Sequence, residues 1–267
     1  MALSPLLTSM RSAVYKTSNR LRRDFFEVAE LQVSKKGPGQ FVSSADLTAE
    51  KTLIAELRKI RPNASFYAEE SGSTKVEFDG EGEDEQQLWI IDPLDGTTNF
   101  LHGLPHWCIS IAYAEKGRVK AAMIFDAFKE ELFTAELGEG AFLNEKRFRI
   151  AGRSEMNECI FGTEIPSKGR PDQDKFSVEL SKIMAKSAGV RCFGSAALNI
   201  AYVAAGRLDG YWNRDLKAWN VAAGILMVME AGGSVTDLSG KSKRLMAGEI
   251  VAANPSIHQT LLQELQS

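Results

Sequence analysis

The sequence predicts a layered α/β protein in which a first part, with an antiparallel sheet between helices, precedes a smaller α/β part. Three observations predict it. A long amphipathic pattern fills the N-terminus, short apolar runs alternate with turns over residues 108–150, and strands are interleaved with helices after Gly152. We place the boundary after residue 151, which gives parts at 1–151 and 152–267 with the functional site at their junction.

The first part is expected to open with two helices. Apolar residues recur at helical spacing through residues 6–26 without proline or glycine, which predicts a long first helix. A second helix should start near Asp46 or Thr48 and end before Pro62. Its predicted apolar face consists of Leu47, Leu53, Ile54 and Leu57. A short strand at 65–68 and an exposed acidic loop at 72–87 follow.

The second part should alternate between helix and strand. Helices are expected over about 172–187, from Ser195, and over about 218–231, where Gly232 and Gly233 end the last of these. Strands are expected at 159–163, 190–193, 209–212, 234–235 and 250–251. A final helix begins at Asn254, with Pro255 in its first turn.

Composition excludes several classes of protein. A net charge of -3 over 267 residues gives no concentrated positive surface, so no direct nucleic-acid binding is expected. The three cysteines, Cys108, Cys159 and Cys192, show neither disulfide nor zinc spacing, which favours a reducing cytoplasm. No apolar stretch is long enough to span a membrane, and no leader pattern precedes the first helix.

The segment from Trp89 to Phe100 carries the chemistry. An apolar strand runs into Asp92 and Asp95, and Gly96 and Thr97 follow directly. Oxygen ligands of this kind suit Mg²⁺, which bridges to phosphate oxygens, and Gly96 allows the backbone to approach a phosphate closely. Taken alone, Asp-Pro-Leu-Asp-Gly is also a common turn sequence. The apolar lead favours the metal site, because it buries the first carboxylate and a turn needs no such burial.

This segment resembles the signature of the inositol monophosphatase family, and the resemblance extends over nearly the whole chain. Residues 41–46, 67–71, 194–197 and 218–224 resemble further family motifs in the family's order. The resemblance implies an αβαβα sandwich of the inositol monophosphatase and fructose-1,6-bisphosphatase type, a Mg²⁺ cofactor, a small phosphorylated polyol or sugar as substrate, and a homodimer.

The resemblance also implies roles for individual residues. Glu69, Asp92, the Leu94 carbonyl and Asp95 would bind Mg²⁺, with position 220 as a further ligand. Asp46 and Thr97 would orient the attacking water, with Glu69 beside them. The substrate would be held by Asp95, Gly96, Thr97, Gly194, Ser195, Ala196 and Asn213.

Some neighbouring residues have weaker claims to a role in the site. Glu70 should face away from the metal, because adjacent strand residues point in opposite directions. Lys36 resembles a family lysine near the metals but also suits an exposed loop. His102 and His106 flank a Gly-Leu-Pro segment and are interpreted as structural or loop residues.

The chain departs from the family at two positions. The family's Trp-Asp pair is Trp219-Asn220 here, which removes one negative charge from the ligand set and should weaken metal binding. Asn213 stands where the family has a glutamate that contacts a substrate hydroxyl, although an amide can still hydrogen-bond a hydroxyl. The nearby Asp215 is a candidate to compensate.

Two functions are therefore compatible with the sequence. The first is Mg²⁺-dependent hydrolysis of a phosphate monoester of a small polyol, such as inositol 1-phosphate, by a metal-activated water. The second is a weakly active or inactive phosphatase scaffold that acts as a regulatory binding protein in transcription. Retention of Asp46, Glu69, Asp92, Asp95 and Thr97 favours the first, and Asn220 favours the second.

Overall fold

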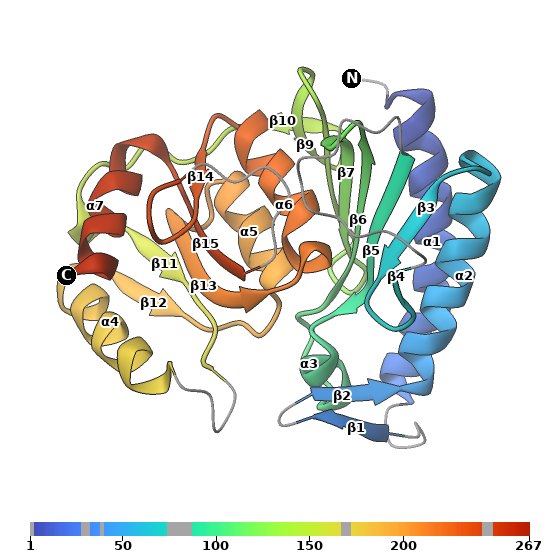
Figure 1. Cartoon of the computed structure of the whole chain (residues 1–267), viewed down its shortest axis with the longest axis horizontal. Helices are drawn as coiled ribbons and strands as arrows, with labels where there is room; N and C mark the ends of the chain where they lie inside the picture. The colour runs from blue at the N-terminus through green and yellow to red at the C-terminus, as the bar shows by residue number, and fades with distance from the viewer. Residues whose placement is uncertain (1–2, 28–32, 38–39, 74–86, 167–171, 242–247) are drawn as a thin grey trace.

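Alternating layers of helix and sheet, in the order αβαβα, make up the molecule (Figure 1). The computed structural model describes residues 3–27, 33–37, 40–73, 87–166, 172–241 and 248–267, and among these the side chains of 33–37, 40–43 and 73 are not described. The predicted layered α/β sandwich is confirmed. Its layers run from the N-terminal helices at one end to α4 and α7 at the other (Figure 1).

Helices α1 (Pro5–Phe26) and α2 (Ser44–Ile60) form the first layer. Ser4 caps α1, because its side chain accepts a hydrogen bond from the Leu7 amide. The apolar face predicted for α2 is wrong at one position: Leu47 is 43% exposed, whereas Leu53 and Leu57 are fully buried. Ala45 and Ala49 complete the buried face, since small residues let the helix lie close to the sheet.

An eight-stranded sheet forms the second layer, in the order β10-β9-β8-β7-β6-β5-β3-β4. The predicted meander over 108–150 is confirmed as five antiparallel strands. These are β6 (Cys108–Glu115), β7 (Arg118–Asp126), β8 (Glu131–Glu136), β9 (Gly140–Leu143) and β10 (Lys146–Phe148). Strand β5 (Gln87–Asp95) pairs antiparallel with β6 and parallel with β3 (Ser65–Ala68). Residues 72–73 form β4, and 74–86 of the predicted acidic loop lie outside the described residues.

Both faces of β5 are buried, which explains its continuous apolar sequence. Trp89 and Ile91 pack in the cluster beneath α1 and α2. Leu88 and Ile90 face the other way, into the cluster formed with the inner helices. The alternation places Asp92 on the inner face of the sheet.

The third layer consists of α5 (Ala196–Ala204) and α6 (Ala218–Glu230), which lie between the two sheets (Figure 1). Both helices are apolar almost all round, because sheets cover them on both sides. The second sheet has the order β12-β11-β13-β15-β14. Its strands are β11 (Ile160–Gly162), β12 (Gly189–Arg191), β13 (Gly210–Leu216), β14 (Ser234–Thr236) and β15 (Gly248–Ala253).

Helices α4 (Gln173–Lys186) and α7 (Pro255–Gln266) cover the outer face of the second sheet. The predicted cap of α7 is confirmed, since the Asn254 side chain accepts hydrogen bonds from the Ser256 and Ile257 amides. The remaining elements are the hairpin β1 (Val33–Gly37) and β2 (Gln40–Ser43), the short helix α3 (Thr97–Leu101) and a 3-10 turn, η2 (Met156–Glu158).

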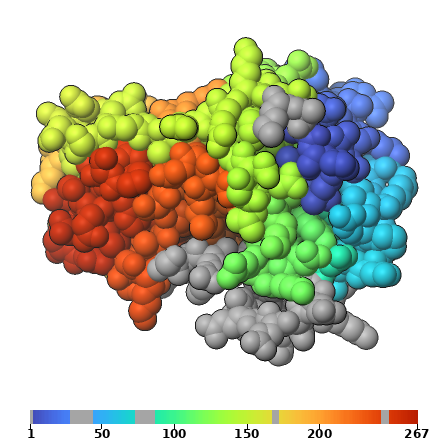
Figure 2. Space-filling model, turned by 90° about the horizontal axis from the view of Figure 1, so that it is seen from above, coloured from blue at the N-terminus to red at the C-terminus, as the bar shows by residue number. Residues whose placement is uncertain are grey.

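The molecule is elongated along the stacking direction of its layers. Seen from above, the red and orange C-terminal elements occupy one end and the blue and cyan N-terminal helices the other (Figure 2). Within the described residues, no helix combines the length and apolarity needed to cross a membrane.

Leu53→Ala should lower the free energy of unfolding by about 2–5 kcal/mol, because it opens a cavity beneath α2. Leu47→Ala, on the exposed side of the same helix, should change it by less than about 0.5 kcal/mol. Urea denaturation of the two variants measures both values. Equal losses would contradict the observed orientation of α2.

Candidate functional site

The site forms where β5 ends. Asp92 is fully buried and Asp95 is 7% exposed, and the pairing of β5 with β6 is irregular between them. Gly96, which follows, has a φ of 95°, a conformation that favours glycine. A Cβ there would lie 3.0 Å from the His106 carbonyl oxygen and 3.3 Å from that of Gly194. Gly96 therefore lets two segments from distant parts of the chain approach the end of β5.

Asp92 lies at the centre of an acidic cluster. Its Oδ1 accepts a hydrogen bond from the Leu94 amide at 3.1 Å. Burial raises the pKa of Asp92 well above its usual range, and the negative charges of Glu69, Asp95 and Asp46 raise it further. A side-chain hydrogen bond with Glu69 acts in the same direction. The structure thus brings together the four carboxylates that the sequence singled out.

Asp95 is held by the start of α5. Its Oδ2 accepts hydrogen bonds from the Ser195 hydroxyl and, at 2.9 Å, from the Ala197 amide. Burial raises the pKa of Asp95 to about 6, although these donors oppose the shift. Ser195, which was predicted as a substrate residue, is fully occupied here as a donor to Asp95 and as the cap of α5.

Asp46 and Thr97 come together as predicted, although 51 residues separate them. The Thr97 hydroxyl lies 2.9 Å from the Leu94 carbonyl oxygen and 3.3 Å from Asp46 Oδ2. Asp46 is buried at the first turn of α2, so that helix aims it at the end of β5. The pair can hold a small polar molecule between α2 and α3.

The cluster has the chemistry of a site for a hard cation. Within the described residues, no lysine or arginine forms an ion pair with Asp92 or Asp95, and a proton or a bound cation would offset the charge of these carboxylates. Only oxygen donors are offered, as Mg²⁺ prefers. Among the described residues no three such side chains already surround a common point, because Asp92 and Asp95 are turned towards hydrogen-bond donors. A bound cation would replace these hydrogen-bond donors at the carboxylate oxygens.

Asn220 lies beside the cluster, as its place in the sequence predicted. Its Oδ1 accepts a hydrogen bond from the Lys217 amide at 3.0 Å and so caps α6. The amide nitrogen therefore points the other way and donates to Asp92 Oδ2 at 3.0 Å. Position 220 thus presents a donor to the cluster in this structure.

Asn213 is occupied within its own strand. Its Nδ2 donates to the Tyr211 hydroxyl at 2.9 Å, and its Oδ1 accepts from the Arg214 amide at 2.7 Å. Arg214 continues into a buried ion pair with Glu179 of α4. Asp215, the candidate for compensation, is exposed and has a φ of 58° where β13 breaks register with β15.

Two residues near the site had no role assigned from the sequence. The Glu164 carboxylate accepts hydrogen bonds from the Gly194 amide and the Asn199 side chain. Asn99 donates to the carbonyl oxygens of His106 and Phe193. Glu164 was detectable as an acid at the carboxyl end of a predicted strand, and Asn99 lies inside the signature segment.

Several other candidates lie in structural positions. The ring of His106 stacks on Phe193 with centroids 4.9 Å apart, and burial lowers its pKa to about 4. The Glu70 amide donates to Glu50 Oε2 at 2.8 Å. The side chain of Lys36 lies outside the described residues.

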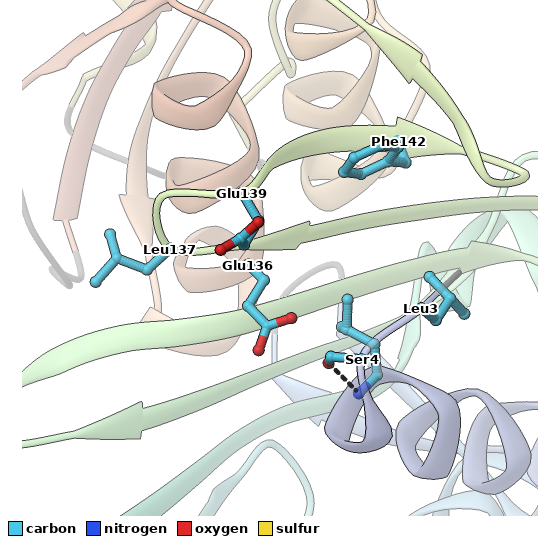
Figure 3. A pocket seen from close by; sticks show the side chains of 7 residues that line it. Leu3, Ser4, Glu136, Leu137, Glu139 and Phe142 are labelled. Carbon is cyan, nitrogen blue, oxygen red and sulfur yellow. Dashed lines mark hydrogen bonds between the residues drawn. The ribbon is translucent and has the colours of Figure 1, made fainter. Parts of the chain in front are cut away.

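A cavity of about 300 Å³ elsewhere lacks the chemistry of the carboxylate cluster. It lies between the start of α1 and the turn from β8 to β9 (Figure 3). Leu3, Leu137 and Phe142 supply apolar walls, and Glu136 and Glu139 supply carboxylates. The Ser4 hydroxyl also lines this cavity, but it caps α1 by accepting a hydrogen bond from the Leu7 amide, so the end of β5 is the better candidate site.

Fold and site together define a class of protein: a five-layered α/β sandwich with a buried carboxylate cluster at the end of a central strand. The chain matches the model of the inositol monophosphatase family over residues 2–267 and belongs to that family. Its members support a phosphatase activity for the chain, and the family is generally metal-dependent.

Named relatives fall into two groups. The chain is 48% identical to an inositol-1-monophosphatase of Rhizobium meliloti over 266 residues, which are 100% of this chain and 98% of the relative. It is 39% identical to Nus factor SuhB of Pseudomonas aeruginosa, covering 99% and 97%. The crystal structure of extragenic suppressor protein suhB from Bartonella henselae shares 45% identity, with a TM-score of 0.92 and 99% coverage of both chains.

The metal-free protein should lose stability as the pH rises from 7 to 8. Burial and the charge of Asp95 raise the pKa of Glu164 to about 8, against 4.5 for the ordinary carboxyl. The folded state therefore holds this proton more tightly than the unfolded chain, and the free energy of unfolding falls with pH through this window. Thermal melts in EDTA should show a falling Tm, with a smaller slope for Glu164→Gln.

His106 has the opposite effect on stability, but not between pH 7 and 8. Its lowered pKa reduces the free energy of unfolding only below the ordinary histidine pKa of 6.5. Asp209→Asn removes a buried carboxylate that accepts a hydrogen bond from the Ile160 amide at the opposite end of β11, and it is the matched control. A Tm that rises with pH over this window in the parent protein would contradict the prediction.

Proposed function

We propose that the chain is a Mg²⁺-dependent phosphatase that hydrolyses a phosphate monoester of a small polyol, such as inositol 1-phosphate. The observation that carries the proposal is the buried carboxylate cluster beside the Asp46–Thr97 pair. Asp92 and Asp95 are buried carboxylates that are costly to fold, so a function that uses their charge accounts for their presence. The inositol-1-monophosphatase relatives support the substrate class.

In the proposed site, Mg²⁺ would be held by Glu69, Asp92, Asp95 and the Leu94 carbonyl. The bound ions would neutralise the charge of the phosphate, activate a water and stabilise the leaving alkoxide. Asp46 and Thr97 would orient the attacking water: the Thr97 hydroxyl would hydrogen-bond the water, and the water's proton would move towards Asp46. Glu69 lies close enough to Asp92 to share this role. Transfer goes directly to water, so no side chain becomes phosphorylated.

Substrate contacts are proposed for Asp95, the backbone of Gly96 and Thr97, and the turn formed by Gly194, Ser195 and Ala196. The left-handed conformation of Gly96 keeps this backbone open to a phosphate. Asn213 lies in β13, where the pairing with β15 becomes irregular, and a polyol hydroxyl would reach its amide there. Such a contact requires Asn213 to exchange its hydrogen bond with Tyr211.

We propose further that the protein works as a cytoplasmic homodimer. Family resemblance supports the dimer. All three cysteines are free, and two of them are buried, which suits a reducing compartment. Gel filtration with light scattering tests the oligomeric state.

A second function is favoured by Asn220 and by relatives that are named Nus factor SuhB. Because the Asn220 amide donates a hydrogen bond to Asp92, the cluster attracts cations less strongly. A chain with weak metal binding could serve as a regulatory scaffold in transcription. Phosphate release from a panel of polyol and sugar phosphates, over a wide Mg²⁺ range, separates the two functions.

Asp95→Asn should abolish phosphate release while the fold persists. The loss should exceed about a hundredfold, because removal of mere outer-shell partners of a metal ligand already costs about 10- to 100-fold. Asp126→Asn removes a buried carboxylate at the end of β7 and should retain activity. Circular dichroism checks both folds. Activity of Asp95→Asn within about threefold of the parent, under ~1 kcal/mol in barrier, would rule out the site.

Asn220→Asp should lower the Mg²⁺ concentration needed for half-maximal activity. The carboxylate introduced at position 220 would replace a hydrogen-bond donor to Asp92 with a metal ligand. Without metal it would repel the other carboxylates, and with metal it would attract the bound cation. The Tm should therefore fall in EDTA and recover in saturating Mg²⁺. Asn220→Ser, which keeps a neutral cap on α6, is the control. An unchanged Mg²⁺ requirement with identical melts would show that position 220 does not serve the metals.

A further inference from the structure

Glu164 stands at the carboxyl end of β11, next to the substrate side of the proposed site. Strand β11 runs parallel to β13, with Gly162 opposite Tyr211. The Thr163 hydroxyl continues this pairing by donating to the Trp212 carbonyl oxygen at 2.8 Å. The register therefore brings Glu164 level with Asn213, at the edge of the sheet that faces Asp95.

Glu164 and Asn99 hold the two polar groups of a single peptide unit. The Gly194 amide donates to Glu164 at 2.9 Å (Oε2) and 3.1 Å (Oε1). The Phe193 carbonyl oxygen, on the other side of the same peptide bond, accepts from Asn99 Nδ2 at 2.7 Å. Asn199 donates to Glu164 and orients its carboxylate. Asn99 lies in α3, inside the signature segment, whereas Glu164 follows β11 of the second sheet.

Packing alone does not hold this turn, because Gly194 is exposed to solvent. Gly194 has a φ of 82°, and a Cβ there would lie 2.7 Å from Asn99 Nδ2. The turn thus depends on glycine and on the hydrogen bonds at its two ends. Above the raised pKa of Glu164, about 8, its carboxylate is ionised. A hydrogen bond to an ionised carboxylate is about twice as strong as one between neutral groups, so Glu164 then holds the peptide more strongly than Asn99 does.

The clamped turn leads directly to the donors of Asp95. Ser195 and Ala197, one and three residues beyond Gly194, both donate to Asp95 Oδ2. A shift of the Phe193–Gly194 peptide therefore moves the groups that fix the Asp95 carboxylate. The same shift moves the backbone proposed to contact the substrate.

We propose that Glu164 is a positioning residue, which clamps the Phe193–Gly194 peptide together with Asn99 and so fixes residues 193–197 against Asp95. It sets the orientation of Asp95 and, through it, the affinity of the site for divalent cations. The effect on substrate rests on the proposed phosphatase function. The effect on the turn does not.

Glu164→Gln tests the clamp with little change in volume. Glutamine offers one acceptor oxygen and turns an N–H donor towards either Gly194 or Asn199, so one of these bonds is lost. Cys108 reports on the turn without any activity: its Sγ lies 3.8 Å from Ser195 Oγ and is buried beneath it. Cys192, which is exposed, is replaced by serine in every protein compared.

In this background, above the pKa of about 8 at which Glu164 ionises, a thiol reagent should modify Cys108 at least about tenfold faster in Glu164→Gln, the factor expected when a hydrogen bond to a charged group is lost. Asp209→Asn is the matched control, because Asp209 accepts the Ile160 amide at the opposite end of β11 at 2.9 Å. It should lower the unfolding midpoint to a similar extent and leave Cys108 protected. Cys108 modification at the parent rate, or an equal increase in both variants, would overturn the proposal.

Cation binding provides the second measurement. Isothermal titration calorimetry with Mn²⁺ in the absence of substrate should show about tenfold weaker Mn²⁺ binding by Glu164→Gln, as for other residues that support a metal ligand. Asp209→Asn should bind as the parent does. Unchanged Mn²⁺ affinity with a mobile turn would overturn the link to Asp95. If neither the parent nor any variant released phosphate, the proposed phosphatase function would be contradicted. The rates of Cys108 modification would still test whether Glu164 fixes the turn.

Discussion

The rest of the structure depends on the burial of negative charge at the end of β5. Asp92 and Asp95 lie between layers, away from water, where an ionised carboxylate is costly without donors or cations. Two inner helices supply the donors. The N-terminus of α5 gives Asp95 its hydroxyl and amide, and the first turn of α6 gives Asp92 the Asn220 amide. The positive ends of both helix dipoles thus meet the carboxylates.

This arrangement explains why the inner helix layer is shared between two sheets. Helices α5 and α6 follow β12 and β13 of the second sheet, yet their buried faces pack on β5, β6 and β7 of the first. Each half of the chain therefore contributes part of the site. Carboxylates come from the first sheet, and the donors that fix them come from the start of each inner helix.

Local sequence patterns predicted most of the fold and some of the contacts at the end of β5. The apolar residues before Asp92 predicted the buried strand. The family motifs predicted that Asp46 and Thr97, which are 51 residues apart, lie together. The exposure of Leu47 escaped prediction, because the face that α2 presents depends on how the helix sits on the sheet. Glu164 escaped too, since its importance arises from a turn 30 residues away that no local spacing reveals.

Asn213 and Asn220 use their side-chain amides in different ways. At position 213 the side chain is occupied by the Tyr211 hydroxyl and its own strand, so a substrate must compete for it. At position 220 the capping bond from Lys217 fixes the oxygen, and this leaves only the nitrogen for Asp92. A donor at this point stabilises the ionised carboxylate without metal, whereas a ligand would stabilise the bound cation. In the proposed site, Asn220 would therefore favour the stability of the metal-free protein over cation binding.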